Sequence, residues 1–382
     1  MKRRDLLKLG ALGGAALWLP TLKAGYSDRR DLSLRPADQN GVQLPSGFTS
    51  RIVARSGASP IGDCEYVWHH APDGGACFPA RKGGWIYVSN SELGDNAGGA
   101  GALSFDCDGR IIDAYPILAG TSRNCAGGAT PWGTWLSCEE IERGQVWECD
   151  PAGQRKAVVR PALGRFKHEA VAVDPVNKQL YLTEDDADGA LYRFTPDNYP
   201  DLSSGKLEAA RVIRGVTDRV EWDEVEDPSA SDTPTRKQTD SSEFIGGEGI
   251  VYYQGTVYFT TKGDNRVWAY DTDTHGLKII YDHTISLTPI LTGVDNITAA
   301  SDGSLYVAED GGDLQIVVIT RSGELFPIVQ LEGHKASEIA GVAFSPDESR
   351  LYFSSQRGVT GEDAGGITFE ITGPFLLASI DR

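Results

Sequence analysis

The sequence predicts an all-β protein, a six-bladed β-propeller with four-stranded blades. Three observations support this prediction: a strand-like segment with a central aromatic residue recurs, its spacing is nearly constant, and 45 glycines among 382 residues supply many tight turns. The aromatic residues of the six copies are Tyr87, Trp135, Tyr181, Tyr258, Tyr306 and Tyr352. The steps between them are 48, 46, 77, 48 and 46 residues, so five steps give six units with one insertion.

Within each unit the same order of short strands is expected. Residues 169–174 form a first strand that ends in a turn, the aromatic segment 180–183 follows, and 191–194 is a third strand. Fourth strands are expected at 279–281 and 325–329. Four short strands in about 47 residues are typical of a propeller blade.

The last unit ends after its third strand. Residues 48–54 near the N-terminus could supply the missing strand, which would join the two chain ends and remove an open sheet edge. The long step after Tyr181 contains a polar, Pro-containing run, so we expect a long surface loop at 223–243. In an alternative interpretation this insertion is a degenerate seventh blade.

The first 24 residues have the pattern of a twin-arginine export signal. Arg3 and Arg4 precede an apolar stretch, 6–19, that is too short to span a membrane. An ordinary secretory signal or a retained anchor is the alternative. We therefore expect a signal peptide at 1–24, an N-terminal extension at 25–47, a propeller domain at 48–382, and a periplasmic or secreted bacterial protein without a membrane span after signal removal.

The charge excludes some partners. With 54 acidic and 36 basic side chains, the formal net charge is −18, which disfavours nucleic acid and anionic membranes as partners.

All six cysteines lie in the first half of the chain. An even number of cysteines in an exported protein indicates disulfides, with Cys64 and Cys77 as the favoured pair. We expect a monomer.

Polar residues recur where strands meet the channel of the predicted propeller. First strands begin, and second strands end, at the same face near the axis. Second strands end at Cys138, Glu184 and Glu309, while first strands begin near Glu169 and Glu248. Packed carboxylates repel one another unless a cation lies among them. Many oxygen ligands favour calcium, and a cysteine among them favours a transition metal, so a mixed metal site is expected at this mouth.

Several motifs resemble those of the PhoX-type alkaline phosphatases. The most specific is Gly133-Thr-Trp-Leu-Ser-Cys138-Glu-Glu140, preceded by Asn124-Cys-Ala-Gly-Gly. The others are Lys167-His-Glu169, Gly247-Glu248-Gly249, Asp295-Asn296, Glu309-Asp310-Gly311 and Ala340-Gly341-Val-Ala-Phe-Ser-Pro-Asp347. Members of that family are exported by the twin-arginine route, fold as six-bladed propellers, and hydrolyse phosphomonoesters at an iron and calcium cluster.

The resemblance implies a set of site residues. Cys138 would be the thiolate ligand of Fe³⁺, and Glu92, Glu169 and Glu248 would be carboxylate ligands. The remaining coordination, of calcium (Ca²⁺) or of both metals, would come from Asp295, Asn296 and Glu309. The substrate would be a small phosphorylated molecule.

One departure from the family pattern concerns the phosphate. The family has an arginine shortly before the glutamate that corresponds to Glu248, whereas this chain has Ile245-Gly246-Gly247. Lys262 and Arg123, or Lys237, could replace it, and Lys262 is the best placed by the repeat. Two alternative functions remain open: a calcium-dependent lactonase or esterase propeller, and a non-catalytic metal-binding propeller.

Overall fold

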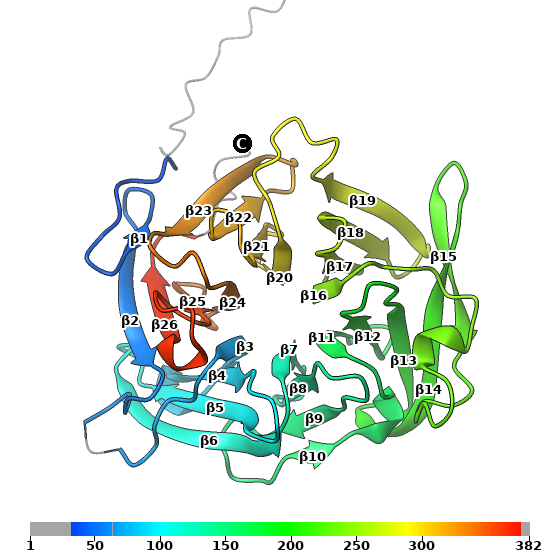
Figure 1. The fold of residues 1–382 in the computed structure, drawn as a ribbon, viewed down its shortest axis with the longest axis horizontal. Coiled ribbons are helices and arrows are strands. Elements are labelled where there is room, and N and C mark those ends of the chain that lie inside the picture. Colours follow the sequence, from blue (N-terminus) through cyan, green and yellow to red (C-terminus); the bar gives the residue numbers. More distant parts are fainter. Residues whose placement is uncertain (1–31, 63, 376–382) are drawn as a thin grey trace, which may run out of the picture.

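The computed structural model describes residues 32–62 and 64–375, and six blades surround a central axis (Figure 1). The predicted signal peptide lies outside these residues. Each blade contributes its first strand to a closed ring in which every strand lies beside the next and the last returns to the first. The ring consists of β3 (Pro72–Pro79), β7 (Asn124–Ala129), β11 (His168–Asp174), β16 (Gly247–Tyr253), β20 (Val294–Ala299) and β24 (Ile339–Phe344). The predicted six-bladed β-propeller is confirmed.

The other strands of each blade pair antiparallel, from the axis outward. Blades one and two continue with β4 (Trp85–Ser91), β5 (Gly98–Phe105) and β6 (Ile111–Thr121), and with β8 (Trp135–Glu139), β9 (Val146–Cys149) and β10 (Val158–Val159). Blades three and four continue with β12 (Gln179–Glu184), β13 (Leu191–Asn198) and β14 (Asp201–Ile213), and with β17 (Thr256–Thr261), β18 (Arg266–Asp271) and β19 (Gly276–Asp282). Blades five and six continue with β21 (Leu305–Glu309), β22 (Gln315–Ile319) and β23 (Leu325–Leu331), and with β25 (Arg350–Ser355) and β26 (Ile367–Thr372).

The chain ends close the propeller as the sequence predicts. Strand β2 (Thr49–Arg55) pairs with β26, with Thr49 opposite Thr372 and Arg55 opposite Ile367. A shorter strand, β1 (Val42–Gln43), adds to the outer edge of β23 in blade five. The N-terminal segment thus covers the edges of two blades, which leaves fewer unpaired backbone groups exposed.

The recurring aromatic residues form the packing between blades. Five of the six are buried, and the sixth, Tyr258, is half-buried. Tyr87 of blade one stacks on Tyr352 of blade six with ring centroids 5.0 Å apart, and Trp85 donates a hydrogen bond to the Tyr352 hydroxyl over 3.0 Å. Each buried aromatic side chain contributes about 2–3 kcal/mol through the apolar surface that it removes from water. The aromatic residues that recur in the sequence are therefore buried residues that pack one blade against another.

Blades three and four share one nine-stranded sheet, which the sequence analysis did not expect. Strand β15 (Asp218–Glu224) pairs with β14 and, through Asp218 and Arg219, with β19 (Figure 1). Between β15 and β16 the backbone makes one short 3-10 turn, η3 (Thr235–Lys237). Three further 3-10 turns lie at η1 (Arg81–Gly83), η2 (Pro161–Leu163) and η4 (Asp363–Gly365).

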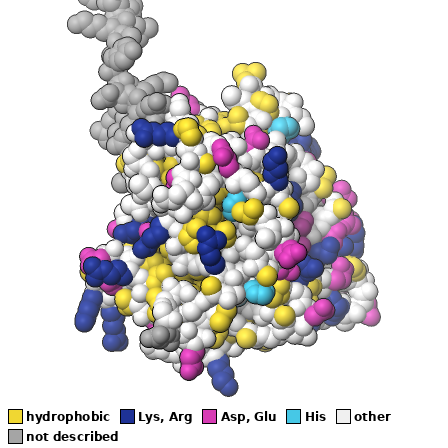
Figure 2. Space-filling model, turned by 60° about the vertical axis from the view of Figure 1, so that its left-hand side comes forward, with side chains coloured by type: hydrophobic (Ala, Val, Ile, Leu, Met, Phe, Trp, Pro, Cys, Tyr) yellow, Lys and Arg dark blue, Asp and Glu magenta, His cyan; other side chains and the backbone are white. Residues whose placement is uncertain are grey.

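The structure tests the predicted disulfide and was searched for membrane-spanning helices. All six cysteines are described and none is in a disulfide, so the pairing of Cys64 with Cys77 is wrong; the Cys64 thiol instead donates to the carbonyl of Ala114 over 3.3 Å. Within 32–62 and 64–375, no helix is long and apolar enough to cross a membrane. Figure 2 shows basic and acidic side chains interspersed on one side of the molecule.

Candidate metal centre

A β-bulge near the start of each first strand positions the candidate site. In blades one to five, one residue of the first strand pairs with the last residue of the second strand. The next two residues of the first strand interrupt the pairing register. A bulge of this kind turns a side chain away from the regular alternation of the strand. The first of the two residues is Asp73, Cys125, Glu169, Glu248 or Asp295, and we call these five residues the bulge ring.

In blades one to four the second residue of the bulge is glycine or alanine, because neighbouring first strands approach one another closely there. A Cβ atom on Gly74 would lie 2.4 Å from the Cα atom of Ala126, and one on Gly249 would lie 2.6 Å from the amide nitrogen of Ile297. Neither contact is sterically allowed. The pairs Asp73-Gly74 and Glu248-Gly249 therefore combine an acid at the axis with a close approach of two blades.

The acidic side chains and one thiol form four overlapping groups at this mouth. In each group, one possible ligand atom from every residue lies within 4.8 Å of the others. The groups are Cys125, Glu140 and Glu169; Glu169, Glu248 and Asp295; Asp295, Asp310 and Glu338; and Asp73, Glu92 and Glu338. Because consecutive groups share Glu169, Asp295 or Glu338, the eight carboxylates and one thiol form a continuous arc.

Glu169 lies at the centre of this arc without enough partners of its own. Its side chain is fully buried, Oε1 accepts a hydrogen bond from the Cys125 thiol over 3.3 Å, and Oε2 has no hydrogen-bond partner. Burial, followed by the charges of Glu248 and Glu140, raises the pKa of Glu169. A buried carboxylate oxygen without a donor is costly, and a cation would satisfy it. This donor set therefore fits a bound metal ion.

Several other acids of the arc also have a raised pKa. Burial raises the pKa of Glu140 to about 8, with Asp185 and Glu92 adding to the shift. Burial is also the largest cause that raises the pKa of Asp295 to about 7, although Lys262 acts in the opposite direction. The protein without metal thus holds several acids that would release protons when a cation binds.

Two arginines flank Glu92 at the rim of the mouth. Nη1 of Arg123 lies 3.1 Å from one carboxylate oxygen of Glu92, and Nη2 of Arg357 lies 3.5 Å from the other. Arg357 also contacts Glu338, with Nη1 2.8 Å from Oε1. Arg123 has a left-handed backbone (φ 49°) that two hydrogen bonds hold, from its amide to Leu93 and from Glu140 to its carbonyl. Both guanidinium groups remain partly exposed, at 51% and 31% for the side chains.

Lys262 reaches the mouth as the sequence predicts, but carboxylates surround its ammonium. Nζ lies 2.6 Å from Glu248 Oε1, 3.2 Å from Asp310 and 3.9 Å from Asp295. The contact with Glu248 is close but is not aligned as a hydrogen bond. Burial lowers the pKa of Lys262, but the three carboxylates outweigh burial and raise it overall. The side chain is therefore charged and held in place.

Three predicted metal ligands do not offer a free donor atom. Cys138 lies one residue before the end of β8 and packs in an apolar cluster with Leu136 and Val146, because alternation along the strand turns its side chain away from the axis. Cys138 therefore lies outside the four groups, and Cys125 is the thiol that donates a hydrogen bond to Glu169. Asn296 accepts from the amide of Gly341 over 2.6 Å and donates to Asp295 over 2.7 Å, so it orients that acid.

Glu309 is the third of these residues. Its two carboxylate oxygens accept hydrogen bonds from the amides of Thr292 (2.7 Å) and Gln315 (2.9 Å). Glu139 and Glu184 end the second strands of blades two and three in the same register, and each accepts from at least one backbone amide. We call Glu139, Glu184 and Glu309 the strand-end glutamates. Their carboxylates accept hydrogen bonds from backbone amides, so these oxygens are not free to bind a cation.

The structure also brings in residues outside the predicted set of metal ligands. Of the predicted ligands, it places Glu92, Glu169, Glu248 and Asp295 in the four groups, and it adds Asp73, Cys125, Glu140, Asp310 and Glu338. The repeated order of one polar residue and one small residue at the start of first strands could have identified Asp73 and Cys125. Glu338, which precedes β24, has no such sequence signal.

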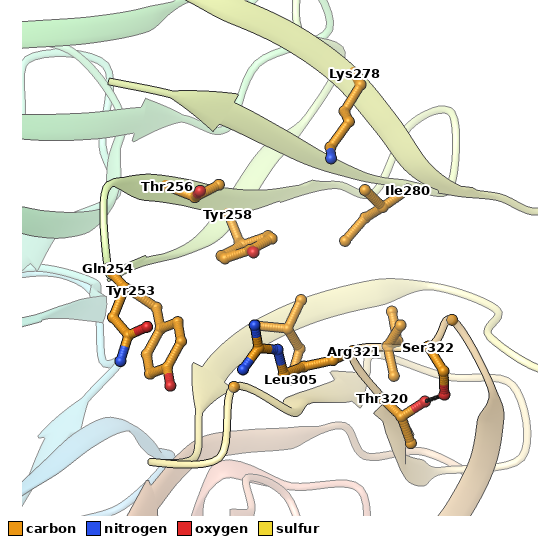
Figure 3. A pocket seen from close by; sticks show the side chains of 13 residues that line it. Tyr253, Gln254, Thr256, Tyr258, Lys278, Ile280, Leu305, Thr320, Arg321 and Ser322 are labelled. Atoms are coloured by element: carbon orange, nitrogen blue, oxygen red, sulfur yellow. Dashed lines mark hydrogen bonds between the residues drawn. The ribbon is translucent and has the colours of Figure 1, made fainter. Parts of the chain in front are cut away.

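Two grooves of the described residues lie away from this mouth. A groove of about 440 Å³ opens between blades four and five at the turns that join β16 to β17 and β22 to β23. Figure 3 shows Tyr258 beside Lys278 and Arg321, which come from opposite walls of this groove. It contains no acidic side chain and no group of metal-binding residues. Among the described residues, the chemistry expected from the sequence is therefore confined to the mouth.

Comparisons with known proteins agree with the fold and with the predicted resemblance. The family model for alkaline phosphatase PhoX matches residues 110–274, and no curated protein matches the sequence. PhoX of Pseudomonas fluorescens in complex with vanadate, a transition state analogue, has a similar structure, with a TM-score of 0.73 and 17% identity over 90% of this chain and 98% of that chain. The gluconolactonase XC5397 of Xanthomonas campestris has a TM-score of 0.55 and 14% identity over the same shares.

At these identities the two solved structures show the shared propeller fold, and the likeness to a family comes from the matched family model. That match includes blades two and three, which contain Cys125, Glu140 and Glu169. Over residues 110–274 the chain is thus similar to the alkaline phosphatase PhoX family, the same family that its sequence motifs resemble.

Proposed function

We propose that this protein is an exported phosphatase that hydrolyses phosphomonoesters at a site holding both iron and calcium at the propeller mouth. The observation that carries the proposal is the buried, unpartnered Oε2 of Glu169 at the centre of eight carboxylates and one thiol. Only bound cations make such a cluster stable when its acids are ionised. The twin-arginine pattern of residues 1–24 supports export of a protein that is already folded and loaded with metal.

The donor atoms favour different ions in different groups. Cys125, Glu140 and Glu169 combine a thiol with two carboxylates, which suits a transition metal such as Fe³⁺. Asp73, Glu92 and Glu338 offer oxygen alone, which suits Ca²⁺. Bound at these groups, the ions would neutralise phosphoryl oxygens and supply an activated oxygen nucleophile.

The protein's own residues would bind and orient the phosphate. Arg123 and Arg357 approach the same carboxylate, Glu92, from the rim, and each guanidinium offers a fork of N–H donors that matches phosphate oxygens. We assign phosphate binding to these two arginines rather than to Lys262, because three carboxylates already surround the lysine ammonium. They replace the family arginine that is missing before Glu248.

The deciding experiment measures hydrolysis of p-nitrophenyl phosphate by protein purified after native export. We expect release of phosphate that chelation abolishes and that iron with calcium restores. An Arg123→Ala/Arg357→Ala variant should raise KM strongly while it keeps its metal, because the arginines contact the acids Glu92 and Glu338 but offer no ligand atom to a cation. Lys237→Ala, which removes an ion pair with Asp188 away from the arc, is the matched control.

The same preparation should be offered a lactone, because the fold is shared with a gluconolactonase and the family arginine is missing. Lactone turnover that depends on calcium, without phosphate release, would replace the phosphatase proposal by the lactonase alternative. Bound metal with neither activity would support a non-catalytic role.

A further inference from the structure

The six blades place one residue each at the step directly after the second strand, and Lys262 is the exception among them. These residues are Glu92, Glu140, Asp185, Lys262, Asp310 and Gln356. Four are acids and one is an amide, so the repeat places oxygen atoms at this level of the mouth. Blade four supplies an ammonium instead. A cation at a position where the neighbouring blades supply anions points to charge compensation within the site.

The ammonium of Lys262 lies between two of the four acidic groups. Glu248 and Asp295 belong to one group and Asp295 and Asp310 to the next, and Nζ contacts all three carboxylates within 4 Å. Blade four itself supplies only Glu248, since blade five supplies both aspartates. The lysine therefore links the carboxylates of two blades, as a metal ion bound to the same oxygens would.

The backbone fixes this placement. The amide of Lys262 donates to the carbonyl of Gly246 over 2.7 Å, in the turn that leads into β16 and Glu248. The side chain is 32% exposed, and Glu248 beside it is almost fully buried. Without Lys262, Glu248 would be a buried carboxylate with like charges as its neighbours, a strongly unfavourable state.

We propose that Lys262 is a built-in counter-ion that takes the place of one metal ion, so that the chain binds fewer ions than its acids could hold. The inference depends on the proposed metal site and specifies its stoichiometry. In this account the Cys125 group and the Asp73 group bind metal, while Lys262 neutralises the oxygens between them. Replacing Lys262 by an uncharged residue would create a further calcium site from Glu248, Asp295 and Asp310.

The test counts bound ions in wild type and in Lys262→Met, which keeps the length of the side chain and removes its charge. Both proteins are stripped with a chelator, titrated with Ca²⁺, and assayed by calorimetry and elemental analysis. We expect one additional Ca²⁺ per chain in Lys262→Met and a lower Tm for its metal-free form. The same number of ions in both proteins would overturn the inference.

Two further variants keep the test decisive if Lys262→Met folds poorly without metal. Lys262→Met/Glu248→Gln removes one positive and one negative charge and should return to the wild-type number of ions. Lys237→Met, at an ion pair with Asp188, should bind as many ions as wild type. If wild type binds no ion and Lys262→Met binds one, the metal-site proposal fails while the counter-ion role holds.

Discussion

The bulge ring, four acids and one thiol, and the strand-end glutamates lie on neighbouring strands of the blades, and the surroundings of Glu169 and Glu309 differ sharply. Glu309 and Glu139 each accept hydrogen bonds from two backbone amides, so their carboxylates are satisfied by the fold itself. Glu169 has an oxygen with no partner and like charges as its neighbours. The difference teaches that burial and acidity alone do not identify a metal ligand; an oxygen left without a donor separates Glu169 from Glu309 and Glu139.

The largest effect is expected at the bulge ring. Glu169→Gln keeps the shape of the side chain and removes a ligand shared by two groups. Phosphatase activity should fall by more than the roughly 10–100-fold that loss of a residue supporting a ligand costs. Stability of the metal-free protein should not fall, because the variant removes a like charge. Activity assays and urea unfolding measure both effects, and a fully active Glu169→Gln would remove this residue from the site.

Cys125 and Cys138 of blade two test which thiol binds the metal. Cys125→Ser should lose bound iron, because a hydroxyl is a poor substitute for a thiolate. Cys138→Ser should keep its metal and lose about 1–3 kcal/mol of stability, because its hydroxyl would be buried among apolar side chains. Elemental analysis and chemical unfolding of both variants check this pair. Iron loss in Cys138→Ser alone would reverse the assignment.

At the strand-end glutamates, the expected effect is on stability. Glu309→Ala would leave the amides of Thr292 and Gln315 without their acceptor. Hydrogen bonds to a charged group contribute about 1.5–3 kcal/mol each, so we expect a loss of about 3–6 kcal/mol for the pair. Urea unfolding of the metal-loaded protein measures it, with Glu309→Gln, which keeps one acceptor oxygen, as the milder control. Loss of metal at unchanged stability would contradict this role.

The smallest effect is the pH dependence of the metal-free protein. Burial raises the pKa of Asp295 to about 7 and that of Glu140 to about 8, above their values in the unfolded chain. The folded state therefore binds more protons than the unfolded state between about pH 4 and pH 8. Stability should fall as the pH rises through this window, by a few degrees in Tm, and bound metal should reverse the trend. A metal-free Tm that rises with pH would contradict the account.

The repeat made the fold predictable, because each blade has an aromatic second strand that packs against a neighbouring blade. It also predicted the closure by β2, since the last unit lacked a fourth strand. Strand β15 escaped prediction because it is polar and pairs outside the blade pattern.

The site was predictable only in part. In blade two the predicted strand end, Cys138, was one residue too early. Because side chains alternate along a strand, that slip exchanged a core cysteine for an acid at the strand end. The bulges hid Asp73 and Cys125 for a related reason, since their side chains depart from the alternation.

The most direct test of the central claim is elemental analysis of the protein purified after native export. The account predicts iron and calcium bound in whole-number ratios to the chain, with both retained through dialysis and removed only by strong chelators. An active phosphatase that contains neither metal would contradict the claim that the bulge ring holds the cations on which the reaction depends.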